Sequence, residues 1–243
     1  MAFSIRAITL DLDDTIWPIA PAIDRAEAAL DAWLLRHAPR AAARWPLDAR
    51  RALRDAVDAE HPQFAHDFTR QRLITLERML RDSGEDVALV DAAFEAYFAA
   101  RCEVEHYDDS VDALQRLAAR VPLAALSNGN ACLTRIGLMP LFRFQLGARE
   151  HGAAKPAASI FHAACRQLDV PPQHVLHVGD DVELDVVGAA RAGLRTCWIN
   201  RVDRDGRARP WPHRLPRPDL EFPTLAALAD WLDATHANEQ SAA

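Results

Sequence analysis

Short apolar runs alternate with amphipathic stretches along much of this chain. Four runs have the continuous hydrophobic pattern that is typical of strands covered on both faces. These runs occupy residues 5–10, 121–126, 174–178 and 194–199. Helical patterns lie between and after them, at residues 109–120, 156–169, 182–193 and 224–236. Strands that alternate with helices predict an α/β fold, in which a parallel sheet has helices on both faces.

Residues 16–108 break this alternation and contain no run with a convincing strand pattern. Their amphipathic helical stretches lie at about 22–37, 48–60, 66–82 and 86–101. We therefore expect a Rossmann-like parallel sheet core, formed by residues 1–15 and 109–243, with an all-helical domain inserted as residues 16–108. The segment 201–223 is rich in Arg and Pro, and we expect it to be an irregular loop.

Composition narrows the class of protein. The chain has 243 residues, half of them hydrophobic, which suits a core domain that carries a smaller one. Its net charge of -7 argues against nucleic acid as a partner, because binding a phosphate backbone usually needs a basic surface. The four Cys residues have no metal-site spacing, and no apolar run is long enough to span a membrane. We expect a soluble, cytoplasmic protein; the pattern indicates no particular oligomeric state.

Polar clusters follow three of the predicted strands at the point where each strand ends. They are Asp11-Leu12-Asp13-Asp14-Thr15, Ser127-Asn128-Gly129-Asn130 and Gly179-Asp180-Asp181. Ligands of a parallel sheet bind outside the carboxyl ends of its strands, so we expect these clusters to meet in one crevice. Converging carboxylates repel one another unless a cation joins them, and ligand sets made only of oxygen favour Mg²⁺ over zinc. The sequence therefore predicts a magnesium site.

Candidate partners for a phosphate group lie in the same clusters. They are the hydroxyl of Ser127, the amides around Asn128 and the ammonium group of Lys155. Lys155 is the single Lys among 28 cationic side chains, which suggests a site that needs a compact point charge. A helix expected after Asn130 would add the positive end of its dipole. These features indicate that the ligand is a small phosphorylated metabolite.

The acidic pair Asp11 and Asp13 permits a two-step hydrolysis. Asp11 would attack phosphorus and form an aspartyl phosphate, while Mg²⁺ and Lys155 neutralise the developing charge. Asp13 lies on the same face of an extended backbone, where it would protonate the leaving alcohol and later deprotonate the attacking water. The alternative is that both residues only order a turn, which is the usual role of Asp after a strand.

The segments DLDDT, SNG, Lys155-Pro156 and GDD…D resemble, in this order, the four motifs of the haloacid dehalogenase-like hydrolases. The resemblance covers about residues 6–200, and the helical insertion is similar to the helical cap of that family. It implies that Asp11 is the nucleophile and a metal ligand. It also implies that Asp13 is the general acid and base and a metal ligand through its carbonyl oxygen.

The same resemblance implies that Ser127 and Lys155 bind phosphate and that Asp180 completes the metal shell. For Asp181 and Asp185 it leaves two alternatives open. Either residue would be a metal ligand, or it would be a partner of Lys155 and of metal-bound water.

Longer segments resemble the bacterial flavin-pathway phosphatases of this family. They are HDFTRQRLITLERML, SNGNA and HVLHVGDDVELDVVGAARAGLRTCWI. This similarity implies a role in riboflavin biosynthesis, with FMN or 5-amino-6-(5-phospho-D-ribitylamino)uracil as the substrate. Arg70 and Arg72 would then contact the substrate from the helical domain, unless they lie on a solvated helix face. Trp17 would stack on a flavin-like ring, or else pack against protein.

Other functions fit parts of the pattern. The substrate could be another small phosphate, such as a sugar phosphate or a nucleotide, and a phosphotransferase such as a phosphomutase differs only in the acceptor. A 2-haloacid dehalogenase attacks carbon and needs no Mg²⁺, but such relatives lack the carboxylate that Asp13 supplies here. A non-catalytic phospholigand-binding protein would be expected to lose one of the charged residues, and all of them are present.

Overall fold

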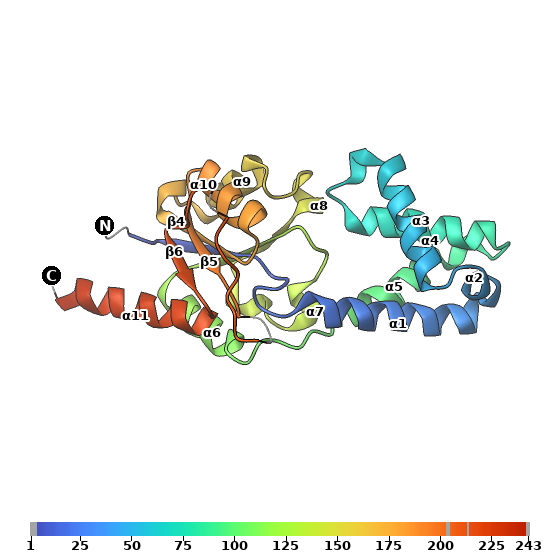
Figure 1. Ribbon diagram of the computed structural model, residues 1–243, viewed down its shortest axis with the longest axis horizontal. Helices are drawn as coiled ribbons and strands as arrows, with labels where there is room; N and C mark the ends of the chain where they lie inside the picture. Colours follow the sequence, from blue (N-terminus) through green and yellow to red (C-terminus); the bar gives the residue numbers. More distant parts are fainter. Residues whose placement is uncertain (1–3, 203–204, 213, 242–243) are drawn as a thin grey trace. The chain divides into compact units, whose positions relative to one another are not determined.

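The computed structural model describes residues 4–202, 205–212 and 214–241, with side chains up to residue 235. The chain forms two compact units (Figure 1). The first, here called the core unit, comprises Met1–Pro18, His106–Gly129 and Leu133–Ala243. The second, here called the helical unit, comprises Ile19–Glu105 and Asn130–Cys132. The assignment of a catalytic core and a cap, with boundaries at 16 and 108, stays a prediction.

A six-stranded parallel sheet forms the centre of the core unit, in the order β3-β2-β1-β4-β5-β6. Its strands are β1 (Ala7–Leu10), β2 (Leu123–Ser127), β3 (Gln145–Gly147), β4 (Val175–Gly179), β5 (Arg195–Ile199) and β6 (Leu220–Phe222). The predicted α/β fold class is confirmed. The strands β3 and β6 were not predicted, because three residues are too few to display a period. Since β6 lies within 201–223, the expectation of an irregular loop is wrong for that part.

Helices cover both faces of this sheet (Figure 1). On one face α6 (Ser110–Arg120) packs against α11 (Leu225–Ser241), and α9 (Ala158–Leu168) and α10 (Gly188–Arg191) lie on the other. The remaining helical segments are short: α7 (Leu133–Ile136), η3 (Met139–Leu141), α8 (Ala148–His151), η4 (Pro172–His174) and the π-helical η5 (Val182–Val187). Among the described residues, no helix combines the length and the apolar content that crossing a bilayer requires.

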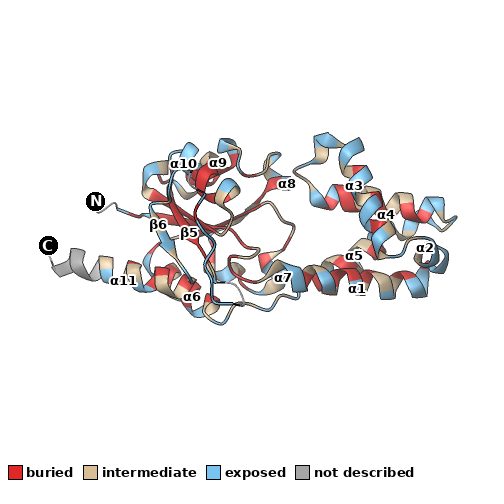
Figure 2. Ribbon diagram, in the orientation of Figure 1, coloured by how far each residue is buried: buried red, intermediate tan, exposed pale blue. Residues whose placement is uncertain are grey.

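The strands at the centre of the sheet are buried along their whole length (Figure 2). One apolar cluster joins Ala7, Leu126 and Val175 of the strands to Ile160 and Phe161 of α9. Because both faces of the strands are covered, most of the residues that point to either face are apolar. This burial accounts for the continuous hydrophobic runs in the sequence.

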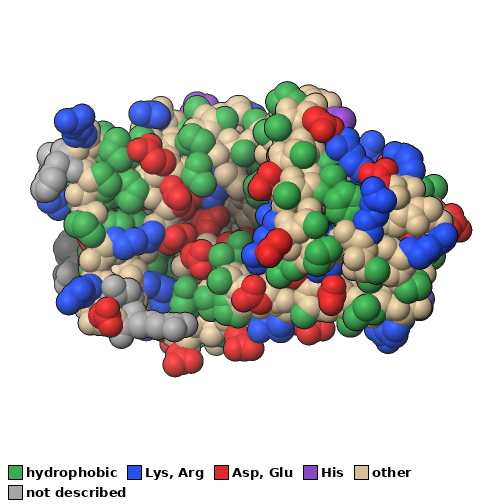
Figure 3. Space-filling view, turned by 45° about the vertical axis from the view of Figure 1, so that its right-hand side comes forward, with side chains coloured by type: hydrophobic (Ala, Val, Ile, Leu, Met, Phe, Trp, Pro, Cys, Tyr) green, Lys and Arg blue, Asp and Glu red, His purple; other side chains and the backbone are tan. Residues whose placement is uncertain are grey.

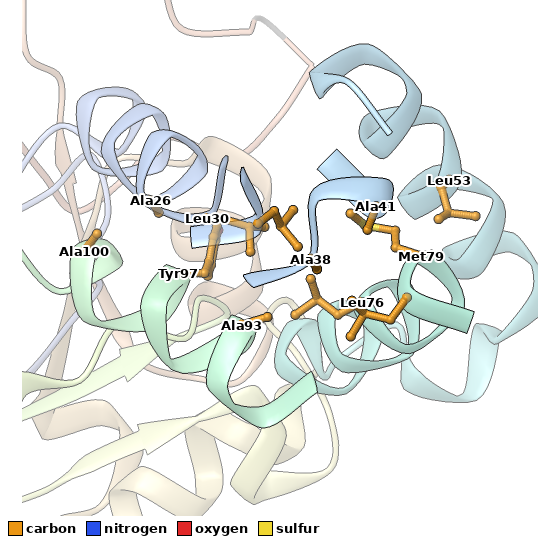
Figure 4. Close-up of a cluster of buried hydrophobic side chains, with 12 residues drawn as sticks. Ala26, Leu30, Ala38, Ala41, Leu53, Leu76, Met79, Ala93, Tyr97 and Ala100 are labelled. Atoms are coloured by element: carbon orange, nitrogen blue, oxygen red, sulfur yellow. The ribbon is translucent and has the colours of Figure 1, made fainter. Parts of the chain in front are cut away.

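The helical unit packs around its own apolar core (Figure 4). Its elements are α1 (Ile19–His37), α2 (Pro39–Arg44), α3 (Leu47–Glu60), η1 (Pro62–Phe64), α4 (Phe68–Asp82), η2 (Val87–Leu89) and α5 (Val90–Arg101). Leu30 of α1, Leu76 and Met79 of α4, and Tyr97 of α5 are buried together. The side chain of Asp67 accepts a hydrogen bond from the backbone N–H of Arg70, so it caps the start of α4. This unit therefore has a hydrophobic core independent of the sheet.

Candidate active site

The order of the strands reverses between β1 and β4, and both strands end in acidic segments. From β1 the sheet continues to β2 and β3 on one side, and from β4 to β5 and β6 on the other. Asp11 follows β1 directly and Asp180 follows β4 directly. The backbone N–H of Asp11 donates to the carbonyl oxygen of Val178 at 2.9 Å, which ties the two strand ends together. Such a reversal point is where open α/β sheets bind ligands.

Lys155 is buried between two carboxylates of this region. Its Nζ lies 2.5 Å from Oδ1 of Asp11 and 2.6 Å from Oδ1 of Asp185, and only 3% of the residue is exposed. Burial disfavours a charged ammonium group, but the negative charges of Asp11 and Asp185 outweigh it and raise the pKa of Lys155. The side chain is therefore a fixed positive charge beside the predicted nucleophile.

Asn128 holds the main chain of Lys155. The Asn128 side chain donates from Nδ2 to the Lys155 carbonyl oxygen at 2.9 Å, and its Oδ1 accepts from the Lys155 N–H at 2.7 Å. Both ends of the Asn128 side-chain amide therefore bond to Lys155. A phosphate contact by the amides around Asn128 stays a prediction. The structure gives Asn128 the task of fixing the position of the lysine.

Ser127 ends β2 at the same edge of the sheet, with 1% of its surface exposed. Its Oγ accepts a hydrogen bond from the N–H of Gly129 at 3.0 Å, so the hydroxyl proton is left to be donated. The helix expected after Asn130 is α7, which has four residues and begins only at Leu133. The expectation that a helix dipole assists at Asn130 is therefore wrong.

Three acidic side chains could share a cation. Oxygen atoms of Asp11, Asp180 and Asp185 all lie within 4.8 Å of one another. Burial, followed by the charge of Asp185, raises the pKa of Asp180 to about 7, and burial also raises the pKa of Asp11 well above its usual value. Figure 3 shows several acidic side chains gathered close together. This arrangement fits a hard divalent cation, because such an ion relieves the repulsion between buried carboxylates.

Asp181 and Asp185 differ in what they contact. Oδ1 of Asp185 accepts from Lys155 and from Nε2 of His177 at 3.1 Å, and its Oδ2 accepts from the Asp181 N–H at 3.0 Å. The Asp181 side chain caps η5 by accepting from the N–H groups of Glu183 and Leu184, both at 2.8 Å. Of the two alternatives, these contacts favour Asp185 as a partner of Lys155 and Asp181 as a helix cap.

Asp13 is held by Trp17, within a tight turn after β1. Nε1 of Trp17 donates to Oδ1 of Asp13 at 2.8 Å, and the Asp14 N–H donates to the Trp17 carbonyl oxygen at 2.7 Å. Asp14 has a φ of 59°, in the left-handed region. The Trp17 side chain is fully buried and its ring meets His106 edge-on, with centroids 5.9 Å apart. Trp17 offers no open ring face, which corrects the expectation that it stacks on a substrate.

The two arginines of the helical unit have different surroundings. Arg72 is buried, its Nη1 donates to Oε1 of Glu27 at 2.8 Å, and its guanidinium lies 4.0 Å from the centroid of the Tyr97 ring. Glu27 already pairs with the Arg72 guanidinium inside the helical unit. Arg72 therefore fits neither the expectation of a substrate contact nor the expectation of a solvated helix face. Arg70 is exposed, with its guanidinium 5.7 Å from the centroid of the Phe64 ring. A substrate contact by Arg70 stays a prediction.

His177 and Arg209 were not predicted from the sequence, and Gly179 was predicted only as part of the polar cluster that follows its strand. His177 bonds to Asp185, Gly179 lies so close to Asp185 that a Cβ would be 2.3 Å from its Cγ, and Arg209 donates to the Asp180 carbonyl oxygen at 2.7 Å. The signal for His177 was a polar residue inside the apolar run HVLHV. Arg209 lies in a stretch of Arg and Pro that has no period, so its position carried no signal.

Comparisons with known proteins agree with this geometry. Residues 5–193 match the model of the family described as haloacid dehalogenase-like hydrolase. The chain is 36% identical to the 5-amino-6-(5-phospho-D-ribitylamino)uracil phosphatase YigB of Escherichia coli (strain K12), over 92% of this chain and 94% of that protein. It is 29% identical to a glyceraldehyde 3-phosphate phosphatase of Methanopyrus kandleri, over 81% and 84%. A crystal structure described as a 2-haloacid dehalogenase from Pseudomonas syringae pv. Tomato DC3000 is 35% identical, with a TM-score of 0.85 and coverage of 95% and 99%.

Proposed function

This chain belongs to the haloacid dehalogenase-like hydrolases, and from that premise we propose that it is a Mg²⁺-dependent phosphatase of phosphate monoesters. One observation carries the proposal. The buried Lys155 ammonium lies 2.5 Å from Asp11, which is grouped with Asp180 at the reversal point of the sheet. A nucleophilic carboxylate beside a fixed cation and a candidate metal site suits attack on a phosphoryl group, which carries negative charge.

The first chemical step uses Asp11 and Asp13. A carboxylate oxygen of Asp11 attacks phosphorus, and the bond from phosphorus to the alcohol oxygen breaks. Asp13, oriented by its hydrogen bond from Trp17, gives a proton to the leaving oxygen. The products of this step are the free alcohol and a phosphoryl group on Asp11.

The second step returns the enzyme to its starting state. Asp13 now accepts a proton from a water molecule, whose oxygen attacks phosphorus. The bond between phosphorus and Asp11 breaks, and inorganic phosphate leaves. Lys155 and the hydroxyl of Ser127 bind the phosphoryl oxygens through both steps, because one supplies a charge and the other a proton to donate.

The carboxylates of Asp11 and Asp180 and the carbonyl oxygen of Asp13 would hold the metal ion. When bound, Mg²⁺ would supply positive charge that stabilises the negative charge of the phosphoryl group. The set contains only oxygen donors, which suits Mg²⁺. Asp185 supports the site by accepting a hydrogen bond from the Lys155 ammonium group.

For the substrate, we propose FMN or 5-amino-6-(5-phospho-D-ribitylamino)uracil. The proposal is supported by the similarity to the YigB phosphatase, which extends over 92% of this chain. A different small phosphate, such as a sugar phosphate or a nucleotide, is the second candidate within the same chemistry. The similarity to a glyceraldehyde 3-phosphate phosphatase is the observation that favours it.

A dehalogenase is the second candidate function, because a relative so described is 35% identical to this chain. Two features favour the phosphatase. Asp13 is a carboxylate in the position of an acid and base, and its hydrogen bond from Trp17 fixes it there. The second feature is that Asp180 is grouped with Asp11 in a candidate metal site. Attack on a haloacid carbon requires no divalent ion.

One assay separates these functions. Purified protein should release phosphate from FMN or from the ribitylaminouracil phosphate when Mg²⁺ is present, and EDTA or Asp11→Asn should abolish the release. Turnover of other phosphates alone would replace the proposed substrate and leave the mechanism in place. Release of halide from 2-chloropropionate in EDTA would contradict the phosphatase proposal.

A further inference from the structure

His177 occupies the middle of β4, next to the catalytic strand β1. Its register partner on β1 is Thr9, and both side chains are almost fully buried. The ring bonds in two directions: Nδ1 lies 2.8 Å from Oγ1 of Thr9, and Nε2 lies 3.1 Å from Oδ1 of Asp185. Phe161 packs against it edge-on, with ring centroids 5.0 Å apart. A polar side chain therefore interrupts an otherwise apolar strand interior.

The contacts of His177 define its tautomer. A carboxylate only accepts hydrogen bonds, so Nε2 must carry the proton that it shares with Asp185. The other nitrogen, Nδ1, is then an acceptor, and the hydroxyl of Thr9 donates to it. Burial lowers the pKa of His177, in keeping with a neutral ring. Such a ring has one donor and one acceptor, and both are satisfied.

Asp185 is fixed from several sides. Its carboxylate lies over Gly179, where a Cβ would come within 2.3 Å of Cγ and Oδ2. Oδ2 accepts from the N–H of Asp181, while Oδ1 accepts from both His177 and Lys155. A carboxylate held in this way leaves Lys155 only a narrow range of positions.

The contacts form a continuous chain that starts on β1 and ends at the residue that directly follows it. It runs from Thr9 through His177, Asp185 and Lys155 to Asp11. We propose that His177 is a positioning residue of the phosphatase: it fixes Oδ1 of Asp185, which holds the Lys155 ammonium against Asp11. This inference rests on the proposed function, because it assigns His177 a part in that same site.

An apolar residue would satisfy the core equally well. A buried imidazole has a desolvation cost that only its hydrogen bonds offset, whereas Val or Leu has none. The polar side chain at position 177 is explained if Oδ1 of Asp185 needs a second hydrogen-bond donor besides Lys155. Without that donor, fewer contacts hold the Asp185 carboxylate, and the position of the Lys155 ammonium group is less well fixed.

The test compares His177→Phe with His177→Gln. The Phe variant keeps a ring in the core and loses both hydrogen bonds, whereas the Gln amide retains a donor for Asp185. In the presence of Mg²⁺, His177→Phe should bind inorganic phosphate and turn over substrate about 10–100-fold less well, the usual loss when a supporting residue of a ligand is removed. His177→Gln should recover most of both losses, and melting curves of each variant check that it is folded.

His162→Phe is the matched control. His162 lies on α9 in the same unit, is half-buried, and its Nε2 bonds to the carbonyl oxygen of Ala192, outside the chain of contacts. The His162→Phe variant should bind phosphate and turn over substrate within about twofold of wild type, because His162 contacts none of the proposed site residues.

A readout independent of activity is the ¹⁵N NMR spectrum of labelled histidine. Wild-type His177 should be the neutral tautomer with its proton on Nε2, and finding the proton on Nδ1 would overturn the inference. Folded His177→Phe that binds phosphate and turns over like wild type would also overturn it, with the proposed function intact. Wild-type protein that neither binds phosphate nor hydrolyses phosphate monoesters would remove the proposed function and this inference with it.

Discussion

The indole Nε1 of Trp17 donates a hydrogen bond of 2.8 Å to Oδ1 of Asp13, four residues earlier in the chain. The turn between them is closed by a second hydrogen bond, from the Asp14 N–H to the Trp17 carbonyl oxygen. Trp17 is fully buried, so the donor has a fixed place. A general acid must point at the leaving oxygen, and this contact limits the directions that the Asp13 carboxyl group can take.

We predict that Trp17→Phe lowers kcat by about tenfold, a fraction of what a general acid contributes, because the ring still packs but no longer orients Asp13. KM should stay within about twofold, since Trp17 does not bind the phosphate group. Steady-state kinetics measure both. Trp45→Phe is the control, because Trp45 donates an equivalent hydrogen bond to the Met79 carbonyl oxygen in the helical unit. Equal kinetics for Trp17→Phe and wild type would remove the orienting role.

A side chain at position 179 should disturb Asp185. In Gly179→Ala the new Cβ would lie 2.3 Å from Cγ of Asp185, so the carboxylate must move. We expect a loss of stability of about 1–3 kcal/mol from overpacking. We also expect weaker phosphate binding, because Lys155 loses one of its two carboxylate partners. Denaturant unfolding and phosphate titration measure the two effects.

Gly147→Ala serves as the matched substitution for that experiment. Its Cβ would meet Oε2 of Glu150, the far end of an exposed side chain that can move away. Both stability and phosphate binding should stay close to wild type. If Gly179→Ala behaved in the same way, close packing of Asp185 over Gly179 would not matter to the site.

Removal of Asp180 should weaken metal binding. We expect Asp180→Asn to bind Mg²⁺ at least about tenfold less tightly, because a direct ligand matters no less than its supporting residues. Asp181→Asn should bind Mg²⁺ almost normally, since Asn caps a helix about as well as Asp and the contacts of Asp181 are those of a cap. Calorimetric titration with Mg²⁺ compares the two. A large loss in Asp181→Asn would instead make Asp181 a metal ligand.

Asp109 should make the core unit sensitive to acid. Its Oδ1 pairs with Nη1 of Arg201 at 2.8 Å, and its Oδ2 accepts from the N–H groups of Leu225 and Ala226 at the start of α11. Burial opposes ionisation, but the Arg201 hydrogen bond and charge outweigh it and lower the pKa of Asp109. A lowered pKa in the folded state means that the carboxylate stabilises the fold above its unfolded pKa of about 3.9.

We predict that Asp109→Asn loses about 1.5–3 kcal/mol of stability at pH 7, the range for a hydrogen bond to a charged group. The difference from wild type should shrink as the pH falls below about 4, because Asp109 of the unfolded chain then binds a proton, whereas folded Asp109 binds one only at a lower pH. Denaturant unfolding at pH 7 and at a pH below about 4 measures the two stability differences. Asp230→Asn is the control: Asp230 pairs with Arg116 at 2.7 Å on an exposed surface, where ion pairs contribute little. A stability difference between Asp109→Asn and wild type that is constant with pH would contradict the lowered pKa of Asp109.

The sequence was informative where chemistry follows a strand. Asp11 and Asp180 each come directly after a continuous apolar run, and the geometry of a parallel sheet brings such residues to one edge. The same reasoning could not find pairings between distant segments. Arg72 meets Glu27, which lies 45 residues earlier, and the Asn128 amide bonds to Lys155, 27 residues later. These contacts depend on how whole helices and loops pack, which no local period encodes.

The continuous apolar pattern of β1 and β4 does not by itself determine the register in which the two strands pair. Where both faces of a strand are covered, a shift of one residue exchanges apolar side chains for other apolar side chains, so hydrophobicity alone barely opposes it. The pairing of Thr9 with His177 opposes it, because a shifted strand would bury both polar groups without partners. The same shift would turn Asp11 away from Lys155. The register of the two strands and the placement of Asp11 beside Lys155 therefore depend on the same pairing.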